Sequence, residues 1–361
     1  MDTGIAAELA EQVTRALADA TGVDTLRALE SGAFPDAAWK ALDGLGLATA
    51  LVPEEQGGAG LGFQDAMPLL EALGRAGAPV PLAEGIAAAA LLSAAGIMPP
   101  DGALTFAAAG APVPWGRHAA HVALVDGARI ALYPAAALRW TAGTNIGREP
   151  RDAAAVIGAP IAEGTLPNAW GGEAALLLTA LVRAALIAGA MSAALALAVE
   201  HANTRKQFGR PIGRFQAVQQ QLAVFAAETS AASVAAAAAA RAADRRGLAA
   251  AAFEIGCAKV TAGEAAAKGA AIAHQVLAAM GITEEHALHH LTRRLWSWRD
   301  DGGSERFWSA RIGALVQGAP AGVLVHGAPA GALVHGAPAG ATQAGGHLWT
   351  FLTSRDEDTS A

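Results

Sequence analysis

The stretch TRKQFGRP, residues 204–211, joins a long apolar segment to a second segment with a helical pattern. It brings three cations and Phe208 together just before Pro211, a residue favoured at the start of a helix. The planar guanidinium of Arg205 suits a phosphate, and the ring of Phe208 suits another planar ring. From the residues alone two interpretations stay open, a basic helix end with a packed phenylalanine and a nucleotide contact.

The segments after residue 171 predict a helical bundle. They are long and rich in alanine, the residue with the highest helix propensity. Four long helices with short connections are typical of a four-helix bundle. The helices are expected at about residues 173–202, 214–245, 248–280 and 284–298.

Residues 174–199 also imitate a membrane span, since they are nearly all apolar and long enough to cross a bilayer. Arg183, the only charge among them, lies near the centre, where a charge is costly in lipid. We therefore expect a buried bundle helix and no membrane.

The other parts of the chain differ in pattern. Residues 1–100 predict an N-terminal helical domain, with helices at 24–29, 35–45 and 64–77. Residues 101–170 predict a small β domain, because apolar runs at 120–125 and 128–133 flank Asp126-Gly127, a hairpin signal. Residues 171–313 form the predicted bundle, and residues 314–361 form a tail with a nine-residue repeat. We predict that the repeat is a loosely held insertion without a metal site.

Composition excludes several classes of protein. The net charge is −7, which is unlike the basic surface of a nucleic-acid binder. The single cysteine, Cys257, permits no disulfide within the chain. The N-terminus lacks the pattern of a secretory signal. We expect a cytoplasmic protein.

Residues 204–219, TRKQFGRPIGRFQAVQ, resemble the signature of the acyl-CoA dehydrogenase family almost residue for residue. The resemblance extends to residues 51–62, 274–286 and 293–300, and it covers most of the chain from about residue 35 to residue 313. It implies a mainly α protein with an N-terminal helical domain, a short middle β domain and a C-terminal four-helix bundle.

The resemblance also implies chemistry. Members use FAD to convert an acyl-CoA thioester to the trans-2-enoyl-CoA, act as homo- or hetero-oligomers, and pass electrons to an electron-transfer flavoprotein. By the resemblance Arg205 meets the FAD pyrophosphate and Phe208 packs near the adenine, often across a subunit interface. Further flavin contacts are expected at Gln207, Gln216 and Gln275.

Two departures concern the cofactor. The family's middle domain usually has a Thr-Glu-Pro and Gly-Ser-Asp loop that holds the flavin ring, and residues 101–166 contain nothing similar. A glycine pair of the family is replaced by Ala278 and Ala279, and each adds a methyl group where close approach to a ligand is expected.

The catalytic base has two candidates by resemblance. Asp301 occupies the position of the usual glutamate but is one methylene shorter, and the alternative is that it and Asp300 are solvated loop carboxylates. Glu264 matches the bundle-helix position that some members use. The alternative for Glu264 is an ordinary i,i+4 pair with Lys268.

Six basic residues near the last bundle helix keep two interpretations each. The histidines are either proton donors or phosphate contacts, or else capping and surface residues. The arginines either reach a CoA or FAD phosphate or pair with nearby acids. These residues are His286, His289, His290, Arg293, Arg294 and Arg299.

Three functions remain open: a complete homo-oligomeric dehydrogenase, a catalytic or non-catalytic partner subunit of a heteromeric one, and a helical scaffold without catalysis. The reduced middle domain favours the partner subunit. The presence of the whole signature at residues 204–219 argues against the scaffold.

Overall fold

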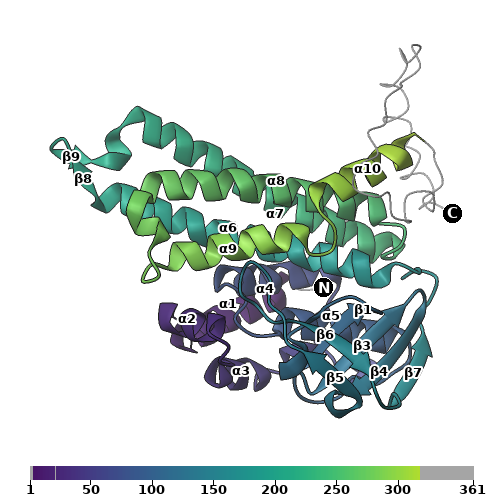
Figure 1. The fold of residues 1–361 in the computed structure, drawn as a ribbon. Coiled ribbons are helices and arrows are strands. Elements are labelled where there is room, and N and C mark those ends of the chain that lie inside the picture. Colours follow the sequence, from purple (N-terminus) through teal and green to yellow (C-terminus); the bar gives the residue numbers. More distant parts are fainter. Residues whose placement is uncertain (1–2, 21, 318–361) are drawn as a thin grey trace, which may run out of the picture.

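The structure is a computed structural model that describes residues 3–20 and 22–317. The long C-terminal helices form one layer, and the N-terminal helices and the strands lie side by side beneath it (Figure 1). The predicted class, mainly α with a small β region in the middle, is confirmed.

Five helices form the N-terminal part. They are α1 (Thr3–Ala20), α2 (Val23–Glu30), α3 (Asp36–Asp43), α4 (Phe63–Arg75) and α5 (Leu82–Ala94). The predicted helices correspond to α2, α3 and α4, whereas α1 and α5 were not separately predicted. In α5 every residue from Leu82 to Ser93 is buried. Such a helix has no polar face, so its periodicity carries little signal.

Seven strands form the β part. They are β1 (Leu104–Ala108), β2 (Val113–Pro114), β3 (His121–Asp126), β4 (Arg129–Pro134), β5 (Leu138–Thr141), β6 (Arg151–Val156) and β7 (Ala162–Thr165). One sheet has the order β1-β3-β4-β7 and another β2-β6-β5. The hairpin predicted at Asp126-Gly127 is confirmed, since β3 and β4 pair antiparallel with Asp126 opposite Arg129.

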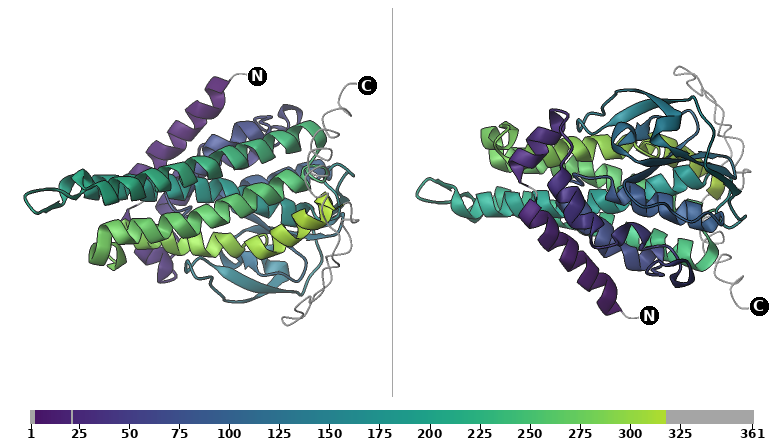
Figure 2. Two further views of the ribbon diagram at one scale, coloured as in Figure 1. Left: turned by 90° about the horizontal axis from the view of Figure 1, so that it is seen from above. Right: turned by 90° about the horizontal axis from the view of Figure 1, so that it is seen from below.

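The C-terminal helices are α6 (Ala174–Thr204), α7 (Gln216–Arg246), α8 (Ala252–Leu277), α9 (Ala287–Asp300) and α10 (Glu305–Val316). The first four match the predicted bundle, and α10 was not predicted. Its N-terminal signal is Ser304, whose hydroxyl accepts a hydrogen bond from the Phe307 N–H. Between α6 and α7 the short strands β8 (Lys206–Gln207) and β9 (Arg210–Pro211) form a hairpin that projects beyond the helices (Figure 1, Figure 2).

Helix α6 lies in the core, as expected. Three helices are long and apolar enough to cross a membrane by length and composition alone, namely α6, α7 and Ala252–Ile282. Within the most apolar window of α6, however, 89% of the residues are buried inside the protein. Arg183, the only charge within residues 174–199, is buried and pairs with Glu84 of α5 at 2.7 Å.

The predicted domain boundaries at residues 100, 170 and 313 stay predictions. The N-terminal helices end at Ala94, the named strands of the β part lie between Leu104 and Thr165, and α10 continues past residue 313 to Val316. The repeat in the predicted tail lies outside the described residues.

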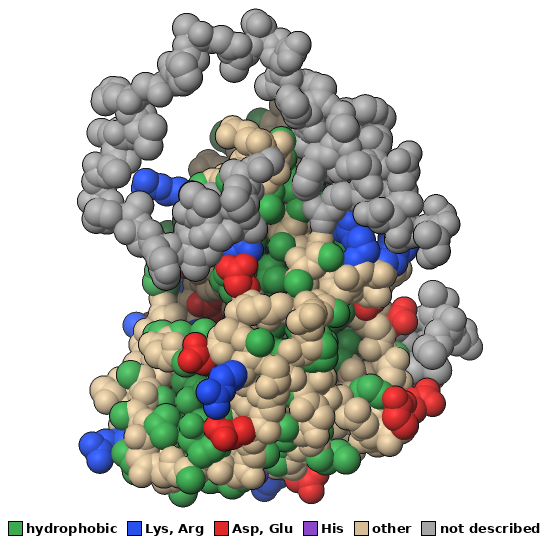
Figure 3. Space-filling model, turned by 90° about the vertical axis from the view of Figure 1, so that its right-hand side faces the viewer, with side chains coloured by type: hydrophobic (Ala, Val, Ile, Leu, Met, Phe, Trp, Pro, Cys, Tyr) green, Lys and Arg blue, Asp and Glu red, His purple; other side chains and the backbone are tan. Residues whose placement is uncertain are grey.

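The end of the molecule that carries the strands has a mixed surface. Acidic, basic and apolar side chains are interspersed on its described part (Figure 3).

Helices α4 and α6 cross in close contact at two glycines. A Cβ atom added at Gly74 would lie 2.2 Å from the Leu186 carbonyl oxygen, and one added at Gly189 would lie 2.0 Å from the Glu71 carbonyl oxygen. The two backbones therefore touch without intervening side chains, which fixes the N-terminal helices against the bundle.

Replacing Gly189 with alanine should lower the free energy of unfolding by about 1–3 kcal/mol, because the new methyl group overpacks this crossing. The control is Gly313→Ala in α10, where no described atom lies within 4 Å of the added Cβ. There alanine should raise stability by up to about 1 kcal/mol through helix propensity. Urea titration of both variants measures the difference, and equal effects would contradict the close crossing.

Candidate functional site

A groove of about 580 Å³ lies at the hairpin end of the bundle, between the end of α6, the start of α7 and the end of α8. It brings together four of the five predicted flavin contacts, Arg205, Gln207, Phe208 and Gln275. Gln216, the first residue of α7, is exposed and is not among the lining residues, although both its neighbours are.

Phe208 stands out from the hairpin. Its side chain is 91% exposed, so the interpretation as a packed phenylalanine is wrong for this chain. Its φ is +51° and that of Gly209 is +80°, as in the tight turns that match the twist of a hairpin. A non-glycine residue in this region costs about 1–2 kcal/mol. The hairpin thus bears strain to hold an aromatic ring in solvent, with the Phe215 ring nearly perpendicular to it at a centroid distance of 6.1 Å.

Arg205 brings positive charge to the same groove. It caps α6, with its N–H donating to the His201 carbonyl oxygen at 2.9 Å, and no acidic side chain among the described residues pairs with its guanidinium. Burial, and then the charge of Arg205, lower the pKa of His201 below its ordinary value. A free guanidinium beside an exposed ring and two amides suits a phosphate joined to a flat heterocycle. The groove therefore fits the adenine and pyrophosphate end of FAD.

Helix α8 ends in the groove at an unusual residue. Ala278 has φ +51° and ψ −134°, a conformation that a side chain disfavours. The expectation that this position suits glycine is thus met in the backbone, while the side chain is alanine. The methyl groups of Ala278 and Ala279 line the groove that a glycine pair would leave wider.

A second cavity, of about 390 Å³, lies between β1, α6 and the turn that joins α9 to α10. Arg151, Arg183 and Asp301 line it. The Asp301 carboxylate accepts hydrogen bonds from Arg151 and from Arg183 Nε, the latter at 3.1 Å. The interpretation of Asp301 as a solvated loop carboxylate is therefore wrong, whereas its neighbour Asp300 is exposed.

This ion-pair network determines the proton affinity of Asp301. Burial by itself raises the pKa of the carboxyl, but the charges of Arg151 and Arg183 outweigh burial and hold the pKa below its usual value. A general base works best with a pKa near the operating pH. In this arrangement Asp301 is a weak base, and its predicted catalytic role stays a prediction.

Glu264 lies on the exposed side of α8 and lines neither cavity. Lys268 pairs with Glu228 of α7 at 2.8 Å in place of the expected pair with Glu264. Among the described residues nothing buries the Glu264 carboxylate. Its role as a base also stays a prediction.

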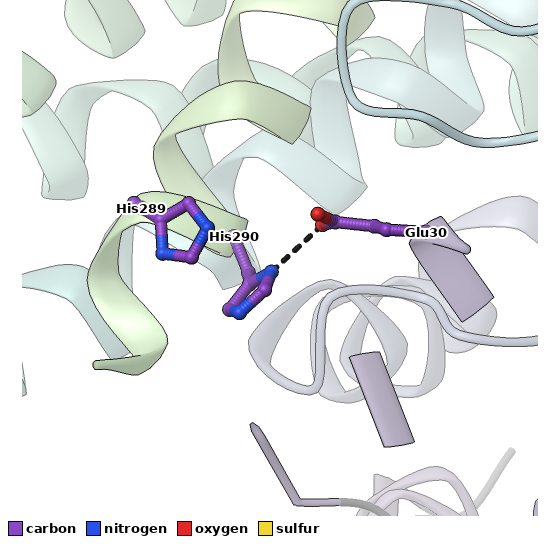
Figure 4. A group of neighbouring side chains, drawn as sticks. All are labelled: Glu30, His289 and His290. Carbon is purple, nitrogen blue, oxygen red and sulfur yellow. Dashed lines mark hydrogen bonds and ion pairs between the residues drawn. The ribbon is translucent and has the colours of Figure 1, made fainter. Parts of the chain in front are cut away.

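The interpretation of His289 and His290 as surface residues is wrong, because both are buried. Figure 4 shows that they are adjacent and that His290 points toward Glu30. His290 Nδ1 lies 2.8 Å from an oxygen of Glu30, the last residue of α2. Arg293 and Arg294 donate to the same carboxylate at 3.0 and 2.9 Å. The alternative that the arginines pair with acids is confirmed, for Arg299 and Glu305 as well, and His286 caps α9 as expected.

Glu30, His289 and His290 have the residue types of a metal site, and their ligand atoms lie within 4.8 Å of one another. Two guanidinium groups already occupy the carboxylate, however, and they would repel a cation. Burial raises the pKa of Glu30, but the His290 hydrogen bond and the charge of Arg294 lower it to about 2. The cluster is better described as an ionic contact that fastens α2 to α9.

Lys259 of α8 was not singled out from the sequence. Its side chain is 0% exposed, and its ammonium donates to the Arg299 carbonyl oxygen at the end of α9. Burial lowers the pKa of Lys259 to about 8, although the acids Glu305, Asp301 and Asp300 oppose the shift. The sequence signal that could have identified Lys259 is a lysine between Ala258 and Val260 on an otherwise apolar helix face.

Comparison with known proteins settles the family. The acyl-CoA dehydrogenase C-terminal domain matches residues 173–306, and the family's N-terminal domain matches residues 6–97. Acyl-CoA dehydrogenase IpdE2 of Mycobacterium tuberculosis is 32% identical over 298 residues, which cover 79% of this chain and 89% of IpdE2. The chain belongs to the acyl-CoA dehydrogenase family.

Solved structures show the same fold as this acyl-CoA dehydrogenase-family chain. A variant of the Tcur3481-Tcur3483 steroid ACAD superposes with a TM-score of 0.78 at 25% identity, covering 88% of this chain and 99% of the other. The ChsE4-ChsE5 complex from Mycobacterium tuberculosis gives a TM-score of 0.77 at 24% identity, covering 89% and 100%. The predicted family and fold are therefore confirmed.

Replacing Ala278 with glycine should stabilise the protein by about 1 kcal/mol, since relief of the positive φ exceeds the entropy cost of glycine. The matched control is Ala279→Gly, because Ala279 is not among the residues with positive φ. That change should destabilise by up to about 1 kcal/mol. Thermal unfolding of the two variants compares them, and a loss of stability in Ala278→Gly would contradict the strain.

Lys259 should make stability depend on pH. The folded-state pKa of about 8 lies below the ordinary 10.5, so the unfolded chain binds the extra proton between these values. Stability should therefore rise with pH in that window, by about 3 kcal/mol for this shift. The measurement is the free energy of unfolding of the wild type relative to Lys259→Met from pH 7 to pH 10.5.

The control is Lys268→Met. Lys268 is exposed, and its hydrogen bond with Glu228 raises its pKa, so no such rise relative to the wild type is expected. Parallel pH profiles for the wild type and Lys259→Met would show that Lys259 does not titrate in this window.

Proposed function

We propose that the chain is one subunit of an FAD-dependent acyl-CoA dehydrogenase whose active site is completed by a related partner subunit. The reaction is the α,β-dehydrogenation of an acyl-CoA thioester to the trans-2-enoyl-CoA. One observation carries this proposal: the chain holds the strained, exposed ring of Phe208 next to the unpaired guanidinium of Arg205, at its projecting end. Within this chain nothing described covers them.

The groove residues then have separate roles. Arg205 would bind the pyrophosphate as a charged donor, and Phe208 would stack near the adenine. The amides of Gln207 and Gln275 would supply neutral hydrogen bonds, whereas Gln216, outside the groove in this chain, would reach the flavin only from its edge. When bound, FAD supplies the acceptor for the hydride that leaves the β-carbon.

The state of Asp301 supports a partner that contributes the base. Removal of the α-proton needs a carboxylate that can accept a proton near neutral pH. Arg151 and Arg183 hold the pKa of Asp301 low, so this carboxylate is better suited to fixing the turn that lines the cavity. Two similar structures bear the names of two components, Tcur3481-Tcur3483 and ChsE4-ChsE5, which also supports a heteromeric assembly.

A complete homo-oligomeric dehydrogenase is the second candidate. The cavity of about 390 Å³ beside Asp301 favours it, because a ligand there would be close to a carboxylate of this chain. In either assembly we propose a cytoplasmic protein that passes electrons to an electron-transfer flavoprotein.

The test is the visible spectrum of the purified chain, alone and co-expressed with a related subunit. We expect a colourless chain alone and stoichiometric flavin in the pair. Arg205→Ala should lower flavin occupancy of the pair about tenfold or more, through loss of a charged phosphate contact. Arg214→Ala, an exposed arginine outside the groove, is the matched control and should retain flavin.

Other outcomes separate the alternatives. Flavin in the lone chain, reduced by an acyl-CoA, would establish the complete enzyme instead. A colourless protein in every pairing would establish a scaffold. A loss of turnover of about a hundredfold or more in Asp301→Asn or Glu264→Gln, with flavin retained, would place the base in this chain.

A further inference from the structure

We propose that Lys259 is a positioning residue whose buried ammonium group holds the end of α9, and with it residues 300–303, in place as a wall of the cavity beside Asp301. The inference rests on the contacts of Lys259 and does not depend on the proposed function.

The contact of Lys259 is with the end of a helix. Its ammonium donates to the Arg299 carbonyl oxygen, one residue before α9 ends at Asp300. The last carbonyl groups of a helix have no partner within the helix and carry its negative pole. A cation that reaches them from α8 therefore supplies a hydrogen-bond donor to an unpaired carbonyl group and also a positive charge at the negative pole of α9. Because the Lys259 side chain is fully buried, no solvent replaces this contact.

The ammonium also lies in the electrostatic field of carboxylates on the α9–α10 side. The charges of Glu305, Asp301 and Asp300 act on Lys259, and the charge of Arg183 from α6 opposes them. Glu305 also accepts a hydrogen bond from Arg299 Nε at 2.6 Å. Lys259 is thus the cation that α8 contributes to an acidic turn.

Helix α8 approaches this turn closely. A Cβ atom added at Gly263, one helical turn after Lys259, would lie 2.0 Å from Glu305 Oε1. The Glu305 side chain therefore packs directly against the α8 backbone one turn from Lys259, which places α8 and the start of α10 in contact at this level.

The turn itself contains the most permissive backbone in this region. Gly302 and Gly303 are consecutive and have φ of +70° and +99°. Glycine has no side chain to restrict these angles, so contacts must hold the turn. Within the turn the Gly303 N–H donates to the Asp300 carbonyl oxygen at 3.1 Å. From outside, the contacts include Trp308 Nε1 to the Gly302 carbonyl oxygen at 2.7 Å, the two arginines on Asp301, and Lys259.

A buried ammonium group is a costly way to fill this space. Burial disfavours its charged form, and a well-packed apolar side chain in such a place often gives equal or greater stability. A methionine would fill the volume but would leave the Arg299 carbonyl without its donor. Burial of this charge therefore lowers the stability of the whole fold, while its hydrogen bond orders the cavity wall locally.

The test is hydrogen exchange measured by mass spectrometry on the full chain. In Lys259→Met the amides of residues 299–303 should exchange about tenfold faster or more, while α6 and the rest of α8 stay protected, because only a local contact is lost. Lys259→Gln, which keeps an N–H donor without the charge, should lie between this variant and the wild type. Lys268→Met, an exposed lysine on the same helix, should leave the turn unchanged.

Three results would overturn the proposal. The first is unchanged exchange at residues 299–303 in folded Lys259→Met. The second is a uniform rise across the bundle, which would make Lys259 a residue of global stability. The third is failure of both Lys259 variants to fold while Lys268→Met folds, which would also make Lys259 a residue of global stability.

Discussion

The guanidinium group of Arg183 lies inside the protein between Glu84 of α5 and Asp301 of the turn after α9. A buried charge is tolerated only when its partners are in place, and removing one partner of such a pair typically costs about 3–5 kcal/mol. Arg151, at the start of β6, donates to the same Asp301 oxygen, Oδ2, as Arg183 does. The N-terminal helices, the β part and the bundle therefore meet at one ionic network, beside a cavity that the β part, α6 and the α9–α10 turn line.

The two ends of the bundle have opposite characters. At the Asp301 end, charges are paired, glycine-rich backbone is clamped and Lys259 is buried. At the hairpin end, Arg205 is unpaired and Phe208 is exposed in a strained conformation. Charged groups are paired within the chain at the Asp301 end and lack a partner in the described chain at the hairpin end. This difference fits a subunit that forms its own wall of the Asp301 cavity and whose groove is completed by a second subunit. This contrast gives the proposal of a partner subunit its physical basis.

Much of this arrangement could be predicted from the sequence. The four long bundle helices follow from alanine-rich composition, and the β3–β4 hairpin follows from Asp126-Gly127, because both signals are local. The grouping of Arg205, Gln207, Phe208 and Gln275 followed from the family resemblance of residues 204–219 and 274–286. The buried helix α5 was missed because it lacks a polar face, and α10 was missed because its cap, Ser304, is a single residue.

The sequence by itself determined the family, the helical bundle and four of the residues that face the groove, Arg205, Gln207, Phe208 and Gln275. Only the tertiary structure decided the state of the charged groups. Asp301 has its low pKa because Arg151 and Arg183, far away along the chain, converge on it. Glu30 is likewise surrounded by His290, Arg293 and Arg294, and Lys259 is buried by elements that follow it. Electrostatic energies depend on distance and burial, and these are set by packing between segments that no local pattern in the sequence describes.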